Sequence, residues 1–235
     1  MSDELRVQGM DVYYGASQIL FGIDLAVERG ATVALLGRNG AGKSTTFKAI
    51  AGVAPPRAGR VFMREQDITG FAPYRIARRG IGYVPEDRQV FPTLTVRQNL
   101  ELGLKRAGKF GRWTFDDVFR LFPNLAARQN NPAGVLSGGE QQMLTMCRTL
   151  MGDPDLVLID EPTEGLAPLL VEQVGVLLAE IASRGVAILL VEQKLTIALK
   201  ISHRLYVMGH GKIVFEGTPA DLAANADVRR EWLEV

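Results

Sequence analysis

Residues 31–53 read ATVALLGRNGAGKSTTFKAIAGV, and this stretch decides the fold. Residues 31–36 are almost all apolar, which is typical of a strand buried on both faces of a parallel sheet. Residues 37–45, GRNGAGKST, satisfy the pattern G-x-x-x-x-G-K-[ST], and the residues from Lys43 onward read as a helix. A strand, a glycine-rich loop and a helix in this order predict a P-loop. In such a loop, backbone N–H groups wrap phosphates, Lys43 reaches the β- and γ-phosphates, and the Ser44 hydroxyl binds Mg²⁺.

The composition limits the class of protein. The chain has 235 residues, is 47% hydrophobic and carries a formal net charge of +1. This length suits one large domain, and the charge gives no strong basic field, so we do not expect a nucleic-acid partner. A single cysteine, Cys147, excludes an internal disulfide framework, indicates a reducing compartment, and is expected to serve only in packing. The N-terminus lacks a signal-peptide pattern and no apolar run approaches about 20 residues, so we expect a soluble chain that meets a membrane only through a partner.

Other strands flank the P-loop. GIGYVPE, DLVLIDEP and VAILLVEQ are short apolar strands that end in polar residues, with helical stretches between them. They predict a parallel α/β core. LRVQGMDVYY, IDLAVERG and RVFMREQDI alternate in the manner of exposed strands and predict a small antiparallel sheet near the N-terminus. The predicted fold class is therefore α/β, with a P-loop core and an antiparallel β subdomain.

The segment from about residue 87 to 150 lacks such strands and predicts an inserted helical subdomain. We therefore expect one domain over residues 1–235, with an α/β core of about 1–86 and 151–235 and a helical lobe of about 87–150. Within the lobe, KRAGKFGRW favours a solvated loop, with contact to lipid head groups or a membrane partner as the alternative.

Two acids close one of the buried strands. LVLIDE places Asp160 and Glu161 at its end. An acid at this position can hold Mg²⁺ through water, and a second acid can orient or deprotonate an attacking water. Alone the pair is weak, because acids are common at strand ends, but a P-loop in the same chain favours a catalytic role.

LSGGEQQM, residues 136–143, reads as a second helix start suited to an anion. Ser137 and Glu140 fit a capping box, which alone would be the simpler interpretation. Gly138 and Gly139 argue for more, since two glycines weaken a helix start by about 1 kcal/mol each relative to alanine. Capping and phosphate binding can coexist at one helix end.

The motifs stand in the order P-loop, YVP, LSGGEQQ, LIDEP and LLVEQ, and in this order the chain resembles the ATPases of ABC transporters along nearly its whole length. The resemblance implies two ATPase domains that face each other head to tail with ATP between them. Tyr14 is then expected to stack on adenine, with Tyr13 a weaker candidate and a core aromatic the alternative. The implied contacts of ATP are Gly37, Arg38, Asn39, Gly40, Ala41, Gly42, Lys43, Ser44 and Thr45 of one chain, and Ser137, Gly138, Gly139 and Glu140 of the other.

Three positions depart from the common ABC pattern. Glu86 stands where glutamine usually begins the loop after YVP, Ala167 where an aspartate usually follows the acid pair, and Gln193 where a histidine usually touches the γ-phosphate. A glutamate oxygen can approach Mg²⁺, and a glutamine amide can donate to a phosphate oxygen. We therefore expect Ser44, Glu86 and Asp160 at Mg²⁺, and Glu161, Gln193 and Lys43 in catalysis. His203 and His210 match no motif and are expected on the surface or in packing.

YVPEDRQVFPTLTVRQNL, LFPNL, EPTEGLAP and LLVEQ resemble the smaller ATPase of branched-chain amino acid uptake systems. This implies an ATP-hydrolysing importer subunit on the cytoplasmic face of the bacterial inner membrane. It would pair with a second, related ATPase or with itself, contact two membrane permeases, and serve a periplasmic binding protein indirectly. One alternative keeps the machinery and imports urea, amides or other small organic acids. Another is a non-transport ABC ATPase that acts on ribosomes or DNA.

Overall fold

An antiparallel sheet forms from the N-terminal part of the chain, in the order β2-β1-β4-β5. The computed structural model describes residues 3–105, 109–193 and 195–233. The strands of this sheet are β1 (Asp3–Tyr14), β2 (Ser17–Glu28), β4 (Ala58–Met63) and β5 (Gln66–Asp67). The predicted antiparallel sheet is thus confirmed, but RVFMREQDI is not one strand. The chain turns between β4 and β5 at Arg64, whose φ is +55°, and the two halves pair with each other.

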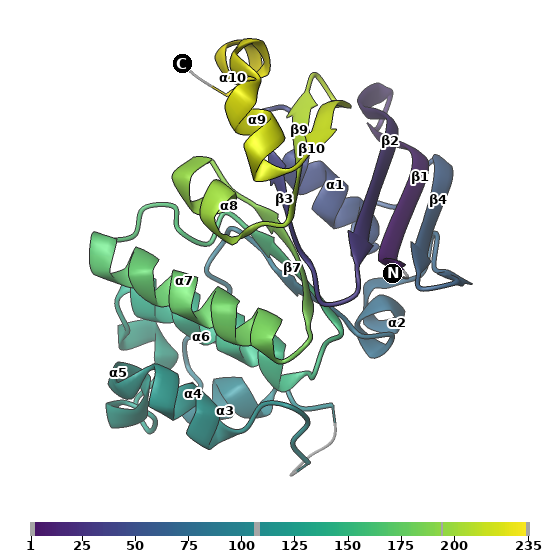
Figure 1. Cartoon of the computed structure of the whole chain (residues 1–235). Coiled ribbons are helices and arrows are strands. Elements are labelled where there is room, and N and C mark those ends of the chain that lie inside the picture. The colour runs from purple at the N-terminus through teal and green to yellow at the C-terminus, as the bar shows by residue number, and fades with distance from the viewer. Residues whose placement is uncertain (1–2, 106–108, 194, 234–235) are drawn as a thin grey trace.

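A second sheet of six strands crosses the middle of the molecule, in the order β10-β9-β3-β8-β7-β6 (Figure 1). The five strands from β9 to β6 run parallel, as predicted, and β10 is antiparallel to β9. The hairpin of β9 and β10 is a feature that the sequence interpretation did not include. The strands are β3 (Thr32–Leu36), β6 (Ile81–Val84), β7 (Leu156–Asp160), β8 (Ala187–Val191), β9 (Arg204–Gly209) and β10 (Lys212–Gly217).

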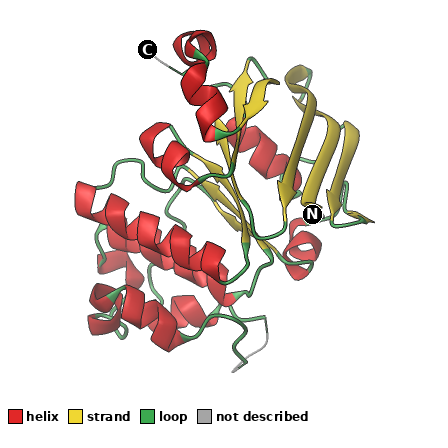
Figure 2. Cartoon of the chain, in the orientation of Figure 1, coloured by secondary structure: helices red, strands yellow, loops and turns green. Residues whose placement is uncertain are grey.

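Helices surround the parallel sheet, and the antiparallel sheet stands apart from most of them (Figure 2). Residues 87–105 and 109–150 form mainly helices and loops, and the division into a core and a helical lobe at the bounds 87–150 stays a prediction. Among the described residues, no helix is both long enough and apolar enough to cross a membrane. The helices are α1 (Lys43–Ile50), α2 (Pro73–Arg78), α3 (Val96–Glu101), α4 (Phe115–Leu121), α5 (Pro123–Ala127), α6 (Gly138–Met151), α7 (Pro168–Ser183), α8 (Leu195–Ile201), α9 (Pro219–Ala224) and α10 (Ala226–Trp232).

Apolar side chains gather on both faces of the parallel sheet. One cluster joins the antiparallel sheet to α1 and to one face of β3, β7 and β8, and includes Phe47, Ile50 and Leu35. A second cluster lies between the opposite face of the sheet and helices α6 and α7. Cys147 is buried in this second cluster, as expected for a packing residue, and burial raises the pKa of its thiol. A third cluster packs Ala34 and Leu36, on the other face of β3, against residues that include Ala198 and Leu222, so the strand that leads into the P-loop is held by packing on both sides.

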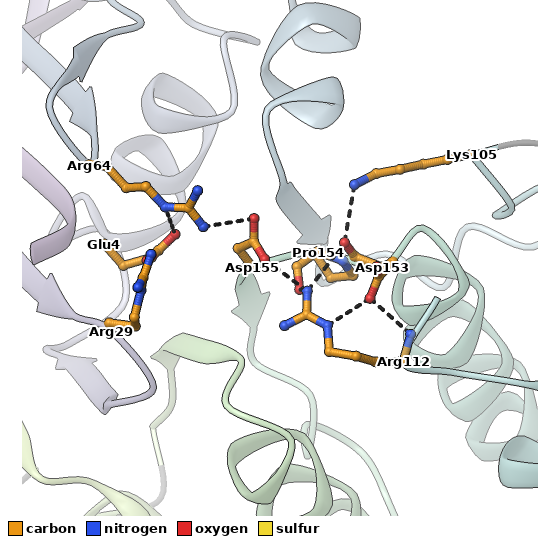
Figure 3. Close-up of polar contacts among 8 residues, drawn as sticks. All are labelled: Glu4, Arg29, Arg64, Lys105, Arg112, Asp153, Pro154 and Asp155. Atoms are coloured by element: carbon orange, nitrogen blue, oxygen red, sulfur yellow. Dashed lines mark hydrogen bonds and ion pairs between the residues drawn. The ribbon is translucent and has the colours of Figure 1, made fainter. Parts of the chain in front are cut away.

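A chain of charges links the antiparallel sheet to the helical side of the molecule (Figure 3). The buried carboxylate of Glu4 accepts from Arg64 at 2.9 Å and from Arg29 at 3.3 Å. Arg64 also pairs with Asp155 at 3.0 Å, and Asp155 pairs with Arg112 at 2.9 Å. Because Asp155 lies just before β7, the start of this strand is tied to both sides.

The KRAGKFGRW stretch is not solvated throughout. Residues 106–108 lie outside the described residues, and Lys109 and Phe110 are exposed. Trp113 at its end is fully buried, with the guanidinium of Arg184 4.1 Å from its ring centroid. The solvated-loop interpretation therefore fails at the C-terminal end of the stretch, where the large apolar ring of Trp113 joins the core and Arg112 joins the charge chain.

Asp117 on α4 accepts hydrogen bonds that stabilise the helical side of the molecule. Its carboxylate accepts from Arg184 at 2.8 Å and from the Thr114 hydroxyl at 2.7 Å. The bond from Arg184, together with the donors of Thr114, holds the pKa of Asp117 well below its ordinary value. A group with a depressed pKa stabilises the fold above its unfolded-state pKa of about 3.9, and this stability is lost as the pH falls.

We expect Asp117→Asn to lower the free energy of unfolding at pH 7 by about 1 kcal/mol, and to lower it much less near pH 1, because this stability is lost only as the pH falls through the depressed pKa of the folded state. Urea unfolding over a pH series measures both values. Asp116→Asn is the matched control, because Asp116 is the exposed neighbour on the same helix. An equal loss of stability for Asp117→Asn at pH 7 and near pH 1 would contradict the assignment.

Candidate functional site

The loop between β3 and α1 takes its shape from glycines. Gly37, Gly40 and Gly42 have φ values of +148°, +81° and +109°, a region that L side chains rarely adopt. A β-carbon on Gly37 would lie 2.5 Å from the carbonyl oxygen of Met208, so the loop also needs glycine for space. Gly42 is the N-cap of α1, whose first turn contains no acidic residue. The first backbone N–H groups of the helix are thus free to face an anion.

Lys43, the first residue of α1, is almost completely buried. Its ammonium donates to the carbonyl oxygens of Gly37 at 2.9 Å and Arg38 at 3.2 Å. It also lies 3.5 Å from a carboxylate oxygen of Glu161. A buried ammonium among carbonyls at the rim of a glycine-rich loop is a positive charge held in place for a phosphate.

Asp160 ends β7 beside the P-loop, where the Ser44 hydroxyl donates to its carboxylate at 3.2 Å. Burial raises the pKa of Asp160 to about 6, and the carboxylates of Glu161 and Glu86 add to the rise. The bond from Ser44 and the charge of Lys43 act in the opposite direction. A hydroxyl and a carboxylate this close offer two of the oxygen ligands that Mg²⁺ prefers.

Glu161 follows Asp160 with a φ of +46°, which is strained for a residue with a side chain. Its backbone N–H donates to the carbonyl of Val191 at 3.0 Å. Its carboxylate accepts a short hydrogen bond from the side-chain amide of Gln193. The loops after β7 and β8 therefore bring two predicted catalytic residues into contact.

Glu86 joins a cluster of acids rather than lying alone. One carboxylate oxygen from each of Glu86, Glu161 and Glu164 lies within 4.8 Å of the other two. The hydrogen bond to Glu161, burial and the charges of Glu161 and Glu86 raise the pKa of Glu164. Glu164 was quoted within EPTEGLAP but was not predicted as a site residue, because only the folded loop brings it to the acid pair.

A cavity of about 450 Å³ opens over these groups. Its volume falls within the range of small-molecule sites. Tyr14 lines the cavity and is 48% exposed. The ring of Tyr13 is covered by Arg57 at 4.1 Å and its hydroxyl donates to Gln18, so Tyr14 is the better placed of the two for stacking. The lining residues are Tyr14, Ile19, Asn39, Gly40, Gly42, Lys43, Ser44, Thr45, Glu86, Glu161, Glu164 and Gln193.

The second helix start lies outside this cavity. Ser137 is the N-cap of α6 and forms the predicted capping box with Glu140, whose carboxylate accepts from the Ser137 N–H at 2.8 Å. A β-carbon on Gly138 would lie 2.0 Å from the guanidinium of Arg88, and one on Gly139 would lie 2.1 Å from Leu170. Side chains of the same chain thus approach both glycines closely. Ser137 is exposed, so a ligand from outside can reach this helix end.

The residues around the cavity fit a nucleoside triphosphate with a divalent cation. The glycine conformations and the start of α1 suit phosphates, Lys43 supplies a positive charge, and Ser44 with Asp160 supplies oxygen ligands. His203 and His210 lie elsewhere: His203 accepts from the Thr32 N–H, and His210 packs against Trp232.

Comparison with known proteins agrees with this geometry. The ABC transporter family profile matches residues 20–164. The high-affinity branched-chain amino acid transport ATP-binding protein BraG of Pseudomonas aeruginosa is 40% identical over 230 residues, which cover 97% of this chain and 99% of that protein. The lipopolysaccharide export system ATP-binding protein LptB of Haemophilus influenzae is 30% identical over 97% of this chain and 96% of that protein.

A solved structure also resembles the whole chain. The crystal structure of an ATP-binding cassette of an ABC transporter in its ADP conformation has a TM-score of 0.84 and 28% identity, covering 98% of both chains. From the family profile, the relatives and the fold together, this chain belongs to the ABC transporter family and is an ATP-binding ATPase.

Proposed function

We propose that the chain powers the uptake of branched-chain amino acids, as the ATP-hydrolysing subunit of an importer. The observation that carries this proposal is the 40% identity to BraG over almost the full length of both proteins. The 30% identity to LptB, an export protein, is lower over a similar span. An exporter subunit and an importer of urea, amides or other organic acids remain the rival functions, because no described residue of the site selects a cargo.

The proposed chemistry assigns one role to each group in the cavity. Lys43 and the first N–H groups of α1 bind the β- and γ-phosphates, and Tyr14 stacks on adenine. Ser44, Asp160 and Glu86 hold Mg²⁺, which when bound neutralises charge on the phosphates. Glu161 orients or deprotonates the attacking water, while Gln193 holds that carboxylate and donates toward the γ-phosphate.

The proposed working unit is a head-to-tail dimer. At the helix end formed by Ser137, Gly138, Gly139 and Glu140, Ser137 is exposed, Gly138 and Glu140 are half-buried and Gly139 is buried, and none of the four lines the chain's own nucleotide cavity. This placement supports a contact with ATP held by another chain, either a second related ATPase or a second copy. ATP would close such a dimer, and hydrolysis with release would open it.

A groove of about 500 Å³ is the surface where we expect a permease to bind. It is lined by parts of α2, β6 and α6 and by Phe91 and Leu102. Leu102 is 56% exposed, and Arg78, Lys105 and Arg148 give the lining a positive charge. The groove begins close to the loop that carries Glu86, so a permease segment seated in it would be near a residue of the nucleotide cavity. Two permeases and, indirectly, a periplasmic binding protein complete the proposed complex, with this chain peripheral on the cytoplasmic face.

We expect Leu102→Asp to abolish the stimulation of ATPase activity by permeases while leaving basal activity unchanged. A charge on a permease-facing apolar residue opposes docking, whereas an exposed substitution costs the fold only about 0.5 kcal/mol or less. Val176→Asp on α7 is the control, since Val176 is 60% exposed and does not line the groove. Stimulation that survives in Leu102→Asp would place the permease contact elsewhere.

The function itself is tested with the whole complex in lipid vesicles. The chain, its partner ATPase, the permeases and the binding protein are reconstituted, and uptake of radiolabelled leucine is measured with and without ATP. ATP-dependent uptake supports the proposal. Uptake of urea or amides instead, or outward movement of lipid, would support a rival. ATPase activity that does not respond to permeases but responds to ribosomes or DNA would contradict transport.

We expect Gln193→Ala to slow hydrolysis by about 10²–10³-fold, which is the usual cost of losing one hydrogen-bond donor aimed at transition-state charge. Glutamine does not titrate near neutral pH, so wild-type activity should show no step near pH 6.5 from this position. Gln193→His should introduce such a step, because histidine has an ordinary pKa of about 6.5. A pH profile of the steady-state rate measures both effects, and an unchanged rate in Gln193→Ala would assign the contact to another residue.

A further inference from the structure

Glu192 is a buried carboxylate that has no role in the chemistry proposed for the cavity. It directly follows β8 and is only 2% exposed. The hydroxyl of Thr163 donates to one of its oxygens at 2.6 Å, and the backbone N–H of Gln193 donates to the other at 3.1 Å. Thr163 is also buried and belongs to the loop after β7. Glu192 thus joins the loops that follow two neighbouring strands.

These hydrogen bonds belong to a closed set that joins the loop after β7 to the loop after β8. The side chain of Gln193 donates to Glu161, two residues before Thr163. The backbone N–H of Glu161 donates to the carbonyl of Val191, just before Glu192. The two loops are therefore connected once through side chains at the cavity and again through Glu192, which is not among the described residues that line the cavity.

The chemistry at this position calls for a carboxylate. Burying a charge is costly unless hydrogen bonds compensate for the lost water, and here each oxygen has a donor. A glutamine at this position could accept from the Gln193 N–H and donate to the Thr163 oxygen, but neither bond would then have a charged acceptor. A carboxylate therefore holds the two loops together more strongly than an amide would.

We propose that Glu192 is a positioning residue for ATP hydrolysis. It fixes the backbone from which the Gln193 amide projects and, through Thr163, keeps that amide aligned with Glu161. The inference rests on the proposed function, in which Glu161 and Gln193 act on the γ-phosphate. It predicts that Glu192 affects the chemical step and leaves nucleotide binding by the P-loop intact.

The first test separates kcat from KM. Glu192→Gln should lower kcat for ATP by about 10-fold or more, since misplacing one transition-state donor has effects of this order, while KM and the Kd for ATP change less than about twofold. Thr163→Val should reproduce the loss, because it removes the hydroxyl that Glu192 accepts from. Thr163→Ser keeps that hydroxyl and should recover most of the rate lost in Thr163→Val. Circular dichroism and thermal unfolding confirm that each variant is folded.

The second test asks whether Glu192 acts through Gln193. In a Gln193→Ala background, Glu192→Gln should change kcat by less than about twofold, because the amide it positions is gone. A residue that only supports the fold would lower kcat by the same factor in both backgrounds, and that result would overturn the proposal. A wild-type kcat in Glu192→Gln would overturn it as well.

The activities of Lys43→Ala and Glu161→Gln distinguish a failure of the proposed function from a failure of the role proposed for Glu192. If both are as active as wild type, the assignment of hydrolysis to this cavity has failed, and the inference about Glu192 fails with it. If both are inactive while Glu192→Gln keeps a wild-type kcat, the proposed function stands and only the role of Glu192 is wrong.

Discussion

Replacing Lys43 with alanine is expected to abolish measurable ATP hydrolysis. Its ammonium is buried at the start of α1, among the carbonyls of Gly37 and Arg38 and 3.5 Å from Glu161. A phosphate bound in the loop would replace the neutral carbonyl acceptors of the ammonium with a negatively charged acceptor. A hydrogen bond to a charged acceptor is stronger than one to a neutral acceptor. No other lysine lines the cavity among the described residues. Steady-state phosphate release measures the loss.

Lys48→Ala is the matched control, because Lys48 stands on the same helix and is exposed. Its turnover should equal that of wild type. Thermal unfolding of Lys43→Ala separates a loss of chemistry from a loss of fold, since ATP with Mg²⁺ should raise the Tm of wild type and raise that of the variant much less. Turnover at the wild-type rate in a folded Lys43→Ala would remove Lys43 from the site.

Glu161→Gln is expected to bind ATP, hydrolyse it very slowly and accumulate a closed dimer. The substitution keeps the shape of the side chain and removes the carboxylate that orients water, so ATP remains between the two chains. Adding Ser137→Arg should prevent this dimer, because a long side chain would occupy the helix end where the other chain's phosphate must approach. Light scattering with ATP measures the dimer, and a nucleotide-binding assay shows that the P-loop still works in the double variant.

Two control variants make the dimer experiment specific. Glu164→Gln removes a neighbouring carboxylate and should not trap the dimer as Glu161→Gln does. Ser137→Ala removes the N-cap of α6, which costs about 1 kcal/mol, without adding bulk. If Ser137→Ala abolishes the dimer as fully as Ser137→Arg, loss of the cap explains the result. A Glu161→Gln, Ser137→Arg variant that dimerises normally would return LSGG to being a helix cap. The same runs with the partner ATPase cover the heterodimer.

Much of the fold could be predicted because its decisive strands are short apolar runs that end in polar groups. This pattern identified β3, β6, β7 and β8, and it requires a parallel sheet buried on both faces. The hairpin of β9 and β10 was missed, since periodicity alone cannot assign short segments to strand or helix. The two strands are joined by a turn at His210 and Gly211, both of which have a positive φ. In the sequence, this turn was signalled by the dipeptide HG.

The site was predictable where a motif fixes the local backbone and was not where two loops must meet. Lys43, Ser44 and Asp160 lie together because the carboxyl ends of β3 and β7 lie at the same edge of the parallel sheet, with β8 between them. Glu164 and Glu192 carry no motif of their own. Their positions depend on how the loops after β7 and β8 fold over each other, which only the three-dimensional structure shows.

The position of β3 in its sheet also determines how late during synthesis this strand can pair with a neighbour. This strand leads into the P-loop, yet it pairs with β8 and β9, and its partner for Thr32 is Ile188. Roughly 150 residues must therefore leave the ribosome after β3 before its first neighbour exists, which takes about 8–30 s at 5–20 residues per second. During that interval an almost entirely apolar strand has no sheet to join, so the nascent chain should need a chaperone and should gain affinity for ATP only when synthesis is nearly complete.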